Sequence, residues 1–206
     1  MPTAEIRIVP RLLREFRKRY PQVEVGLHPL NPGEQVEALR HSRIDLALTR
    51  RLLDEGITFE RFLRESLLLA VARGHPLARS TEVRLDSLRD MPLLLFPRAD
   101  APVLHDTILG FFRSAVISKQ VTYAVTSIHG GLGLVAAGIG VALVPESMED
   151  LRFKGVAYRR LSRPVPTVDM GVARLAEEMT PLQESFLKVL RDLYPKRPSP
   201  SRSSRR

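Results

Sequence analysis

The pattern of apolar residues is most informative in residues 130–145, which read GGLGLVAAGIGVALVP. The first half of this stretch is apolar on nearly every side of a helix, which predicts a short helix inside the molecule. Gly138 follows the last good helix former and can end the helix in a left-handed conformation. The apolar run 141–144 then stops at Pro145, so the pattern predicts a buried helix, a turn and a buried strand.

Strand-like and helix-like patterns alternate along the rest of the chain. Strands are predicted at residues 23–27, 44–48, 58–62, 66–72, 93–96, 121–125, 156–161 and 168–175. Helices are predicted at residues 34–41 and 103–115, and a final helix opens at Thr180-Pro181 with Thr as its cap. This alternation predicts the α/β fold class.

The N-terminal residues 3–20 predict a basic helix, because Ile6, Val9, Leu12 and Phe16 recur at helical spacing. Pro10 fits only the first turn of a helix, so the regular helix is expected to begin near Val9. Residues 5–9 also alternate between apolar and charged side chains, which leaves a strand as the alternative for that segment.

A candidate binding crevice follows the predicted strand 121–125. The next helix begins between residues 127 and 131, and parallel α/β sheets bind ligands outside the carboxyl ends of their strands. The N-terminus of that helix, close to His129, is therefore predicted to face a ligand site.

Composition narrows the class of protein. The chain has 206 residues, 44% of them apolar, no cysteine and a formal net charge of +9. Five basic residues without an acid stand in residues 195–206, which predicts a disordered basic tail. Neither a membrane span nor a secretory signal is visible, so a cytoplasmic protein is expected.

The sequence contains only weak candidates for catalytic or metal-binding residues. The five histidines lack metal-ligand spacing, and the chain has no cysteine and no common nucleophile motif. Gly131 and Gly133 with Glu146 imitate a dinucleotide fingerprint, but close packing of the helix on the sheet is the favoured interpretation. We expect no enzyme activity, no metal and no cofactor.

Four motifs in order resemble one family. They are residues 10–21 with PRLLREF and RYP, residues 43–48 with RIDLAL, residues 74–77 with GHPL, and residues 134–147 with LVAAGIGVALVPES. Across residues 3–194 the chain is similar to the effector-binding domain of LysR-type transcriptional regulators. The resemblance implies two Rossmann-like lobes joined by a double hinge, as in type 2 periplasmic binding proteins.

The resemblance also implies a division of the chain: residues 1–64 with 165–194 as lobe I, and residues 65–164 as lobe II. In the family, a winged helix-turn-helix, a linker helix and a first strand precede the position of Thr3. Only Met1 and Pro2 precede Thr3 here, so the chain resembles a fragment that lacks these parts.

An effector lies between the lobes in this family. Arg50 corresponds to an arginine of members that sense aromatic-degradation intermediates, and its guanidinium would bind a carboxylate; a surface role is the alternative. Pro32 departs from the family, in which a hydroxyl residue is common at that position. The positions that the resemblance implies as effector-binding are Thr3, Asn31, Pro32, Arg50, Arg98, Pro102, Val103, Ser127, Ile128 and His129.

The resemblance finally implies partners. They are a small effector, such as an aromatic or other small carboxylate, and further copies of the chain in a homodimer or larger oligomer. Residues 14–19 and 103–115 are the candidate dimer surfaces. DNA would be bound only through the absent N-terminal domain, and no membrane is expected. The alternatives are a free-standing solute-binding protein of the same fold, which a signal peptide would indicate, and an enzyme that uses the cleft.

Overall fold

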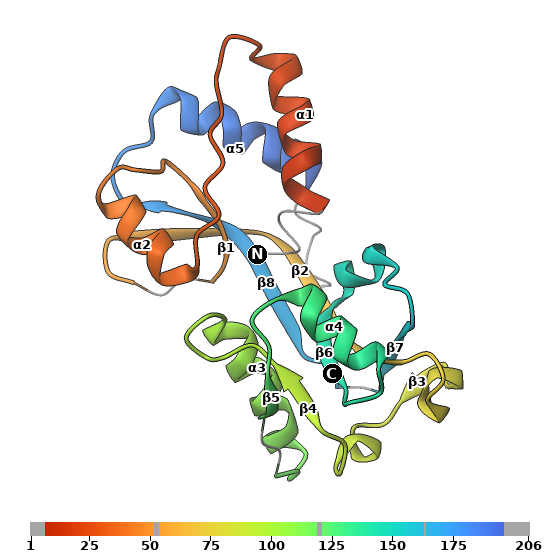
Figure 1. Cartoon of the computed structure of the whole chain (residues 1–206). Coiled ribbons are helices and arrows are strands. Elements are labelled where there is room, and N and C mark those ends of the chain that lie inside the picture. Colours follow the sequence, from red (N-terminus) through yellow and green to blue (C-terminus); the bar gives the residue numbers. More distant parts are fainter. Residues whose placement is uncertain (1–6, 52–53, 119–120, 163, 196–206) are drawn as a thin grey trace, which may run out of the picture.

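The computed structural model describes residues 7–51, 54–118, 121–162 and 164–195, and Figure 1 shows their arrangement. The helices are α1 (Val9–Arg19), α2 (Pro32–Arg40), α3 (Pro102–Ser114), α4 (Ile128–Ala136) and α5 (Pro181–Leu193), with short 3-10 helices η2 (Pro76–Arg79), η3 (Leu85–Leu88) and η4 (Glu146–Leu151). The strands are β1 (Ala47–Arg50), β2 (Ile57–Ala72), β3 (Glu82–Val83), β4 (Leu93–Leu95), β5 (Val121–Ala124), β6 (Ala142–Pro145), β7 (Val156–Leu161) and β8 (Thr167–Leu175). The predicted α/β fold class is confirmed.

Strand β2 is sixteen residues long and runs through both lobes of the molecule (Figure 1). Its first part pairs with β8, from Ile57↔Leu175 to Ser66↔Thr167, and its second part pairs with β6 and β7. Strand β1 lies on the other side of β8, and β3 lies beside β7. Helices α1, α2 and α5 therefore belong to lobe I with β1, whereas α3 and α4 belong to lobe II with β3 to β7.

Each lobe has its own apolar core. In lobe I, α1 and α5 pack against β8, with Phe16 and Leu190 in the same cluster as Met170. In lobe II, alternate residues of β2 point to opposite faces of the sheet, as strand geometry requires. Leu69 packs in the cluster of α3 and Leu68 in the cluster of α4. Because both faces are covered, this half of β2 is apolar without alternation.

Local sequence determines several helix ends. Asn31 accepts a hydrogen bond from the Glu34 N–H at 3.0 Å and Glu34 binds back to the Asn31 N–H, which forms a capping box on α2. Thr180 and Gln183 form the same box on α5, so the predicted cap is confirmed. Helix α1 begins at Val9 as expected, and Ile8 is already in the helical region, against the strand alternative.

Two strand predictions are wrong. Residues 23–27 form no strand, although Val23, Val25 and Leu27 alternate with other residues, because no described strand pairs with them. The predicted strands 58–62 and 66–72 are one strand, β2, which crosses a register shift between Arg61 and Leu63 without ending.

The structure leaves the predicted lobe limits and the predicted tail untested. The predicted lobe limits, residues 1–64 with 165–194 and residues 65–164, stay a prediction. The tail 195–206 lies outside the described residues apart from Pro195. Among the described helices, none has the length and apolar character that a membrane span requires.

The strands of lobe II explain how the predicted crevice forms. Strands β4 and β5 are parallel, and Leu93 of β4 also forms a parallel bridge with Val141 just before β6. Gly138 has φ +78°, the left-handed conformation predicted for the end of α4. The N-terminus of α4 therefore follows the carboxyl end of β5, at the edge of lobe II that faces lobe I (Figure 1).

Candidate functional site

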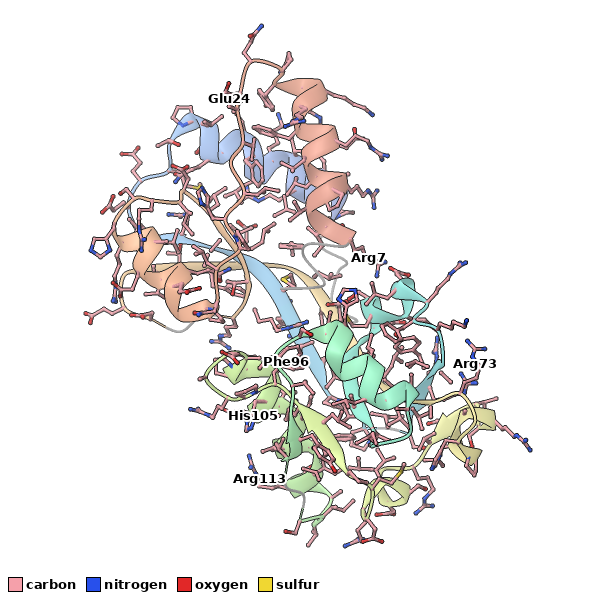
Figure 2. All side chains as sticks on the ribbon, viewed as in Figure 1. Arg7, Glu24, Arg73, Phe96, His105 and Arg113 are labelled. Carbon is pink, nitrogen blue, oxygen red and sulfur yellow. The ribbon has the colours of Figure 1, made fainter. Side chains whose placement is uncertain are left out.

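A cavity of about 490 Å³ lies between the two lobes. Lobe II provides most of its wall, and the carboxyl ends of β4 and β6 and the N-termini of α3 and α4 meet there. Figure 2 shows Phe96, which follows β4, at this edge of lobe II. The lining residues are Leu30, Asn31, Pro32, Thr49, Arg50, Arg51, Leu94, Leu95, Phe96, Asp100, Ala101, Pro102, Val103, Leu104, Val125, Thr126, Ser127, Ile128, Gly131, Leu132, Ala142, Leu143, Val144, Pro145 and Met148.

Three helix N-termini line this cavity: those of α2, α3 and α4. Helix α4 is capped by Ser127, whose Oγ accepts a hydrogen bond from the Gly130 N–H at 3.0 Å. Neither α3 nor α4 has an acidic residue in its first turn, and α3 has no side-chain cap. Because the first N–H groups of a helix carry partial positive charge, these ends favour an anion in the cavity.

Arg50 brings a full positive charge to the lobe I wall. It ends β1, its side chain is 11% exposed, and its Nη2 lies 3.9 Å from Oε2 of Glu65. Burial lowers the pKa of the Arg50 guanidinium, and the nearby Glu65 carboxylate opposes this effect. A guanidinium with so little contact with water is a strong partner for a carboxylate ligand.

Glu65 connects this arginine to lobe II. The Glu65 side chain is 4% exposed and lies on β2, where the strand passes from β8 to β6. Its Oε1 accepts a hydrogen bond from the backbone N–H of Ser147 at 3.2 Å, at the start of η4. One carboxylate therefore contacts both Arg50 of lobe I and a backbone donor of lobe II.

The structure brings seven of the predicted positions together. The cavity wall includes Asn31, Pro32, Arg50, Pro102, Val103, Ser127 and Ile128.

Two predicted positions do not line the cavity, and a third is not described. Arg98 forms an exposed ion pair with Asp106, with 2.8 Å between Nη2 and Oδ2. His129 is exposed, and its ring centroid lies 6.4 Å from that of Phe153. Thr3 lies outside the described residues. The resemblance assigned Arg98 and His129 to segments of the site, but it did not predict where their side chains point.

Sequence reasoning missed several lining residues. Phe96 and Thr126 stand directly after β4 and close after β5, so the rule about carboxyl ends of strands could have identified them. Thr49 is fully buried next to Arg50, and Met148 of η4 stands one residue after the end of the motif at residues 134–147. The surroundings of Gly131 favour close packing of the helix on the sheet over phosphate binding, because a Cβ at this position would lie 3.3 Å from Val125 Cγ2.

The described residues contain no cluster of histidine and acidic side chains that could hold a metal ion. What the cavity does offer is an apolar wall, one buried guanidinium and helix N-termini. This set of groups can hold a small apolar molecule that carries negative charge.

Comparison with known families gives one match that covers most of the chain. A family model described as the LysR substrate binding domain matches residues 1–195. The transcriptional regulator TfdS of Cupriavidus pinatubonensis is 33% identical over 192 residues, which are 92% of this chain and 64% of the relative. The chain therefore spans somewhat less than two thirds of this relative.

Solved structures show the same architecture. The effector-binding domain of BenM with its effector benzoate has a TM-score of 0.84 and 27% identity, over 93% of this chain and 88% of that one. Full-length CbnR in complex with its target DNA has a TM-score of 0.83 and 28% identity, over 94% of this chain and 68% of that one. The overall fold is thus shared with these proteins.

Proposed function

Because the chain belongs to the family of LysR substrate-binding domains, we propose that it is the sensor part of a LysR-type transcriptional regulator. In this proposal a small apolar carboxylate binds between the lobes and controls transcription in the full-length regulator. The observation that carries the proposal is the cavity between the lobes with the buried Arg50 guanidinium in its wall.

The size and the walls of the cavity support a small organic ligand. A volume of about 490 Å³ falls within the range of about 300 to 1,000 Å³ that is typical of ligand pockets. Phe96, Val144 and Met148 offer apolar contacts to a ring or a short chain. Benzoate, the effector of BenM, combines such a ring with one carboxylate, which makes it the first compound to test.

The charges support a carboxylate over a neutral ligand. Arg50 can donate two parallel hydrogen bonds to a carboxylate, and the N-termini of α3 and α4 add partial positive charge. Glu65 already contacts Arg50, so a ligand carboxylate would compete with Glu65 for the guanidinium. Because Glu65 also binds the Ser147 N–H, that competition would reach lobe II.

Binding between the lobes would act by selecting one relative orientation of them. In a full-length regulator this bias would pass to DNA-binding domains through an oligomer, with residues 14–19 and 103–115 as the proposed contact surfaces. We place this activity in the cytoplasm, and we propose no catalytic step. The names of the relatives, which are transcriptional regulators, favour a sensor over a free-standing solute-binding protein.

Ligand-induced stabilisation tests the proposal. A carboxylate at a hundred times its dissociation constant should raise the free energy of unfolding by about 2.7 kcal/mol. We expect this effect from benzoate or a related aromatic carboxylate, measured by urea denaturation, and a much smaller effect from benzamide, which has the same shape without the charge.

Matched variants locate the binding site. Arg50→Lys keeps the positive charge but loses the planar fork, so it should weaken carboxylate binding about tenfold. Arg98→Lys, outside the cavity, should leave the affinity unchanged. Equal stabilisation by benzoate and benzamide, or equal losses in the two variants, would speak against a carboxylate site at Arg50.

A further inference from the structure

The cavity between the lobes carries few charges, and opposite charges come from different lobes. Among the described residues that line it, Arg50 and Arg51 are basic and only Asp100 is acidic. Arg50 ends β1 in lobe I, whereas Asp100 lies in lobe II, in the segment that connects β4 to α3. Figure 2 labels Phe96, which begins this segment. A ligand between the lobes therefore meets a guanidinium from lobe I and a carboxylate from lobe II.

The charge of Arg50 is already balanced before a ligand binds. Its Nη2 lies 3.9 Å from Oε2 of Glu65, and the two side chains are only 11% and 4% exposed. A ligand carboxylate at Arg50 therefore joins a pair whose charges cancel. Because buried charges are weakly screened, one added carboxylate already leaves an excess of negative charge at this wall. A second carboxylate on the same ligand finds no compensation there.

Arg51 does not provide the missing positive charge. Its side chain is exposed, and successive residues of an extended chain point in opposite directions, so it does not repeat the position of Arg50. Arg51 also lines a separate surface hollow together with three acidic residues, Asp54, Glu55 and Asp169. These carboxylates offset its charge, and water and salt screen what remains.

The N-terminus of α2, also in the lobe I wall, does not favour a second anion. The Asn31 side chain accepts the hydrogen bond of the Glu34 N–H at 3.0 Å, and the Asn31 N–H donates to Oε2 of Glu34 at 2.7 Å. Pro32 stands between these residues and has no N–H to donate. The Glu34 carboxylate also offsets the partial positive charge of this helix end. The capping box thus occupies the place that a second ligand carboxylate would need.

Asp100 makes the lobe II wall unfavourable to a second anion as well. It is exposed, and among the described residues its side chain has no ion pair or hydrogen bond. Arg98, two residues earlier, is paired with Asp106 through Nη2 and Oδ2 at 2.8 Å. Asp100 also stands directly before Ala101, the N-cap of α3, so its carboxylate offsets part of the positive charge of that helix end.

We propose that the cavity selects a monocarboxylate and rejects a dicarboxylate, and that Asp100 is the residue that enforces this selection. The inference rests on the proposed function, because it concerns a carboxylate ligand bound at Arg50. The carboxylate of the ligand contacts Arg50, its apolar body lies against Phe96, and its other end faces Asp100. A second negative charge at that end is repelled by Asp100 and has no cation to pair with.

The chemistry of the far end of the ligand follows from Asp100. A carboxylate accepts hydrogen bonds and cannot donate one, so a hydroxyl, amide or amino group at that end suits it. The effector class is therefore an apolar monocarboxylate whose other end is neutral or a hydrogen-bond donor. Benzoate meets the first requirement, since it has one carboxylate and no further charge.

A matched pair of compounds separates charge from size. Terephthalate carries two carboxylates on opposite ends of a ring, and 4-carbamoylbenzoate has nearly the same shape with one of them replaced by a neutral amide. Isothermal titration calorimetry should show that the amide binds at least about tenfold more tightly than terephthalate. Isophthalate and 3-carbamoylbenzoate repeat the comparison with the second group at another angle, and the same preference is expected.

Salt supplies a readout that a difference in shape would not change. Because Asp100 is exposed, its repulsion of a second carboxylate is screened by ions. Raising the salt concentration from about 0.05 to about 0.5 M should therefore reduce the preference for the amide severalfold. A preference that depended on size alone would be the same at both salt concentrations.

A variant and a matched control test the role of Asp100. Asp100→Asn removes the charge and keeps the shape, so it should bring terephthalate to within about threefold of its monoamide. Asp90→Asn makes the same change at an exposed residue of lobe II outside the cavity, and it should keep the full preference. The control also shows whether the total charge of the protein, which both variants change equally, affects the selection.

Each contrary result has a separate meaning. If the unaltered protein binds terephthalate as tightly as the monoamide, the cavity accepts two charges and the inference is wrong, while the proposed function stands. If Asp100→Asn retains the full preference, or Asp90→Asn loses it, Asp100 does not enforce the selection. If neither benzoate nor the two monoamides bind, the proposed carboxylate site fails, and the inference that rests on it fails too.

Discussion

The cavity between the lobes and a groove in lobe I, which lies between residues 23–30 and 43–48, are similar in size, about 490 and 560 Å³, and both are largely apolar. They differ in the polar groups that they leave available. The cavity presents side chains and helix ends, with Arg50 foremost, whereas the groove presents the edges of two extended backbone segments. Size and apolar character therefore do not determine the ligand, since a guanidinium selects a carboxylate and an open strand edge selects another strand.

The largest expected effect concerns Arg50. Arg50→Met leaves the Glu65 carboxylate buried beside an apolar side chain, so we expect a loss of about 3 kcal/mol in the free energy of unfolding. Urea denaturation measures this loss, and adding Glu65→Gln should recover part of it. Arg98→Met, which breaks an exposed pair, should cost less than about 1 kcal/mol.

A smaller effect of opposite sign is expected at Gln35. Gln35→Leu removes a buried acceptor without a partner, which should raise the free energy of unfolding by about 1 kcal/mol. The same change should leave benzoate binding as it is, because Gln35 does not line the cavity between the lobes. Glu37→Leu, on the exposed side of α2, is the control and should stay within about 0.5 kcal/mol. A destabilised Gln35→Leu would show that this oxygen is satisfied in solution.

The smallest effect should appear at a site that belongs to neither hollow. Arg64 donates two hydrogen bonds to Asp169, at 2.6 and 3.0 Å, and these bonds lower the pKa of the Asp169 carboxyl. The pair stabilises the fold above the unfolded-state pKa of about 3.9, and this contribution is lost as the pH falls through the lower folded-state value.

Asp169→Asn should therefore cost about 0.5 kcal/mol at pH 7, and its difference from the unaltered protein should shrink below about pH 4. Urea titrations at several pH values measure this, with the affinity for benzoate expected to stay constant at pH 7. A difference that grew as the pH fell would contradict the assignment of the lowered pKa to Asp169.

Much of the fold was predictable because the signals are local. The Thr180-Pro181 start of α5, the glycine end of α4 and the apolar strands of lobe II depend on neighbouring residues and on burial. The strand predicted at residues 23–27 is absent because a strand requires a pairing partner, and an alternating apolar pattern does not supply one.

The candidate site was predictable where the position of the backbone is enough. Ser127 and Ile128 start a helix after a strand, and the topology brings such positions to the cavity. The prediction for Arg98 failed because the direction of its side chain depends on Asp106. Asp106 lies one turn into the next helix and pairs with Arg98 at the surface. Met148 was missed because η4 reaches the cavity only through the three-dimensional fold.

Both lobes contain part of strand β2, since one part of it pairs with β8 and the other with β6 and β7. In covalent terms lobe II is an insertion between two strands of lobe I. A single cut in the backbone therefore cannot release either lobe as an intact fragment, and dividing the chain into separately expressed halves would split the sheet of one of them. For protein engineering, the smallest transferable unit of this architecture is the pair of lobes together.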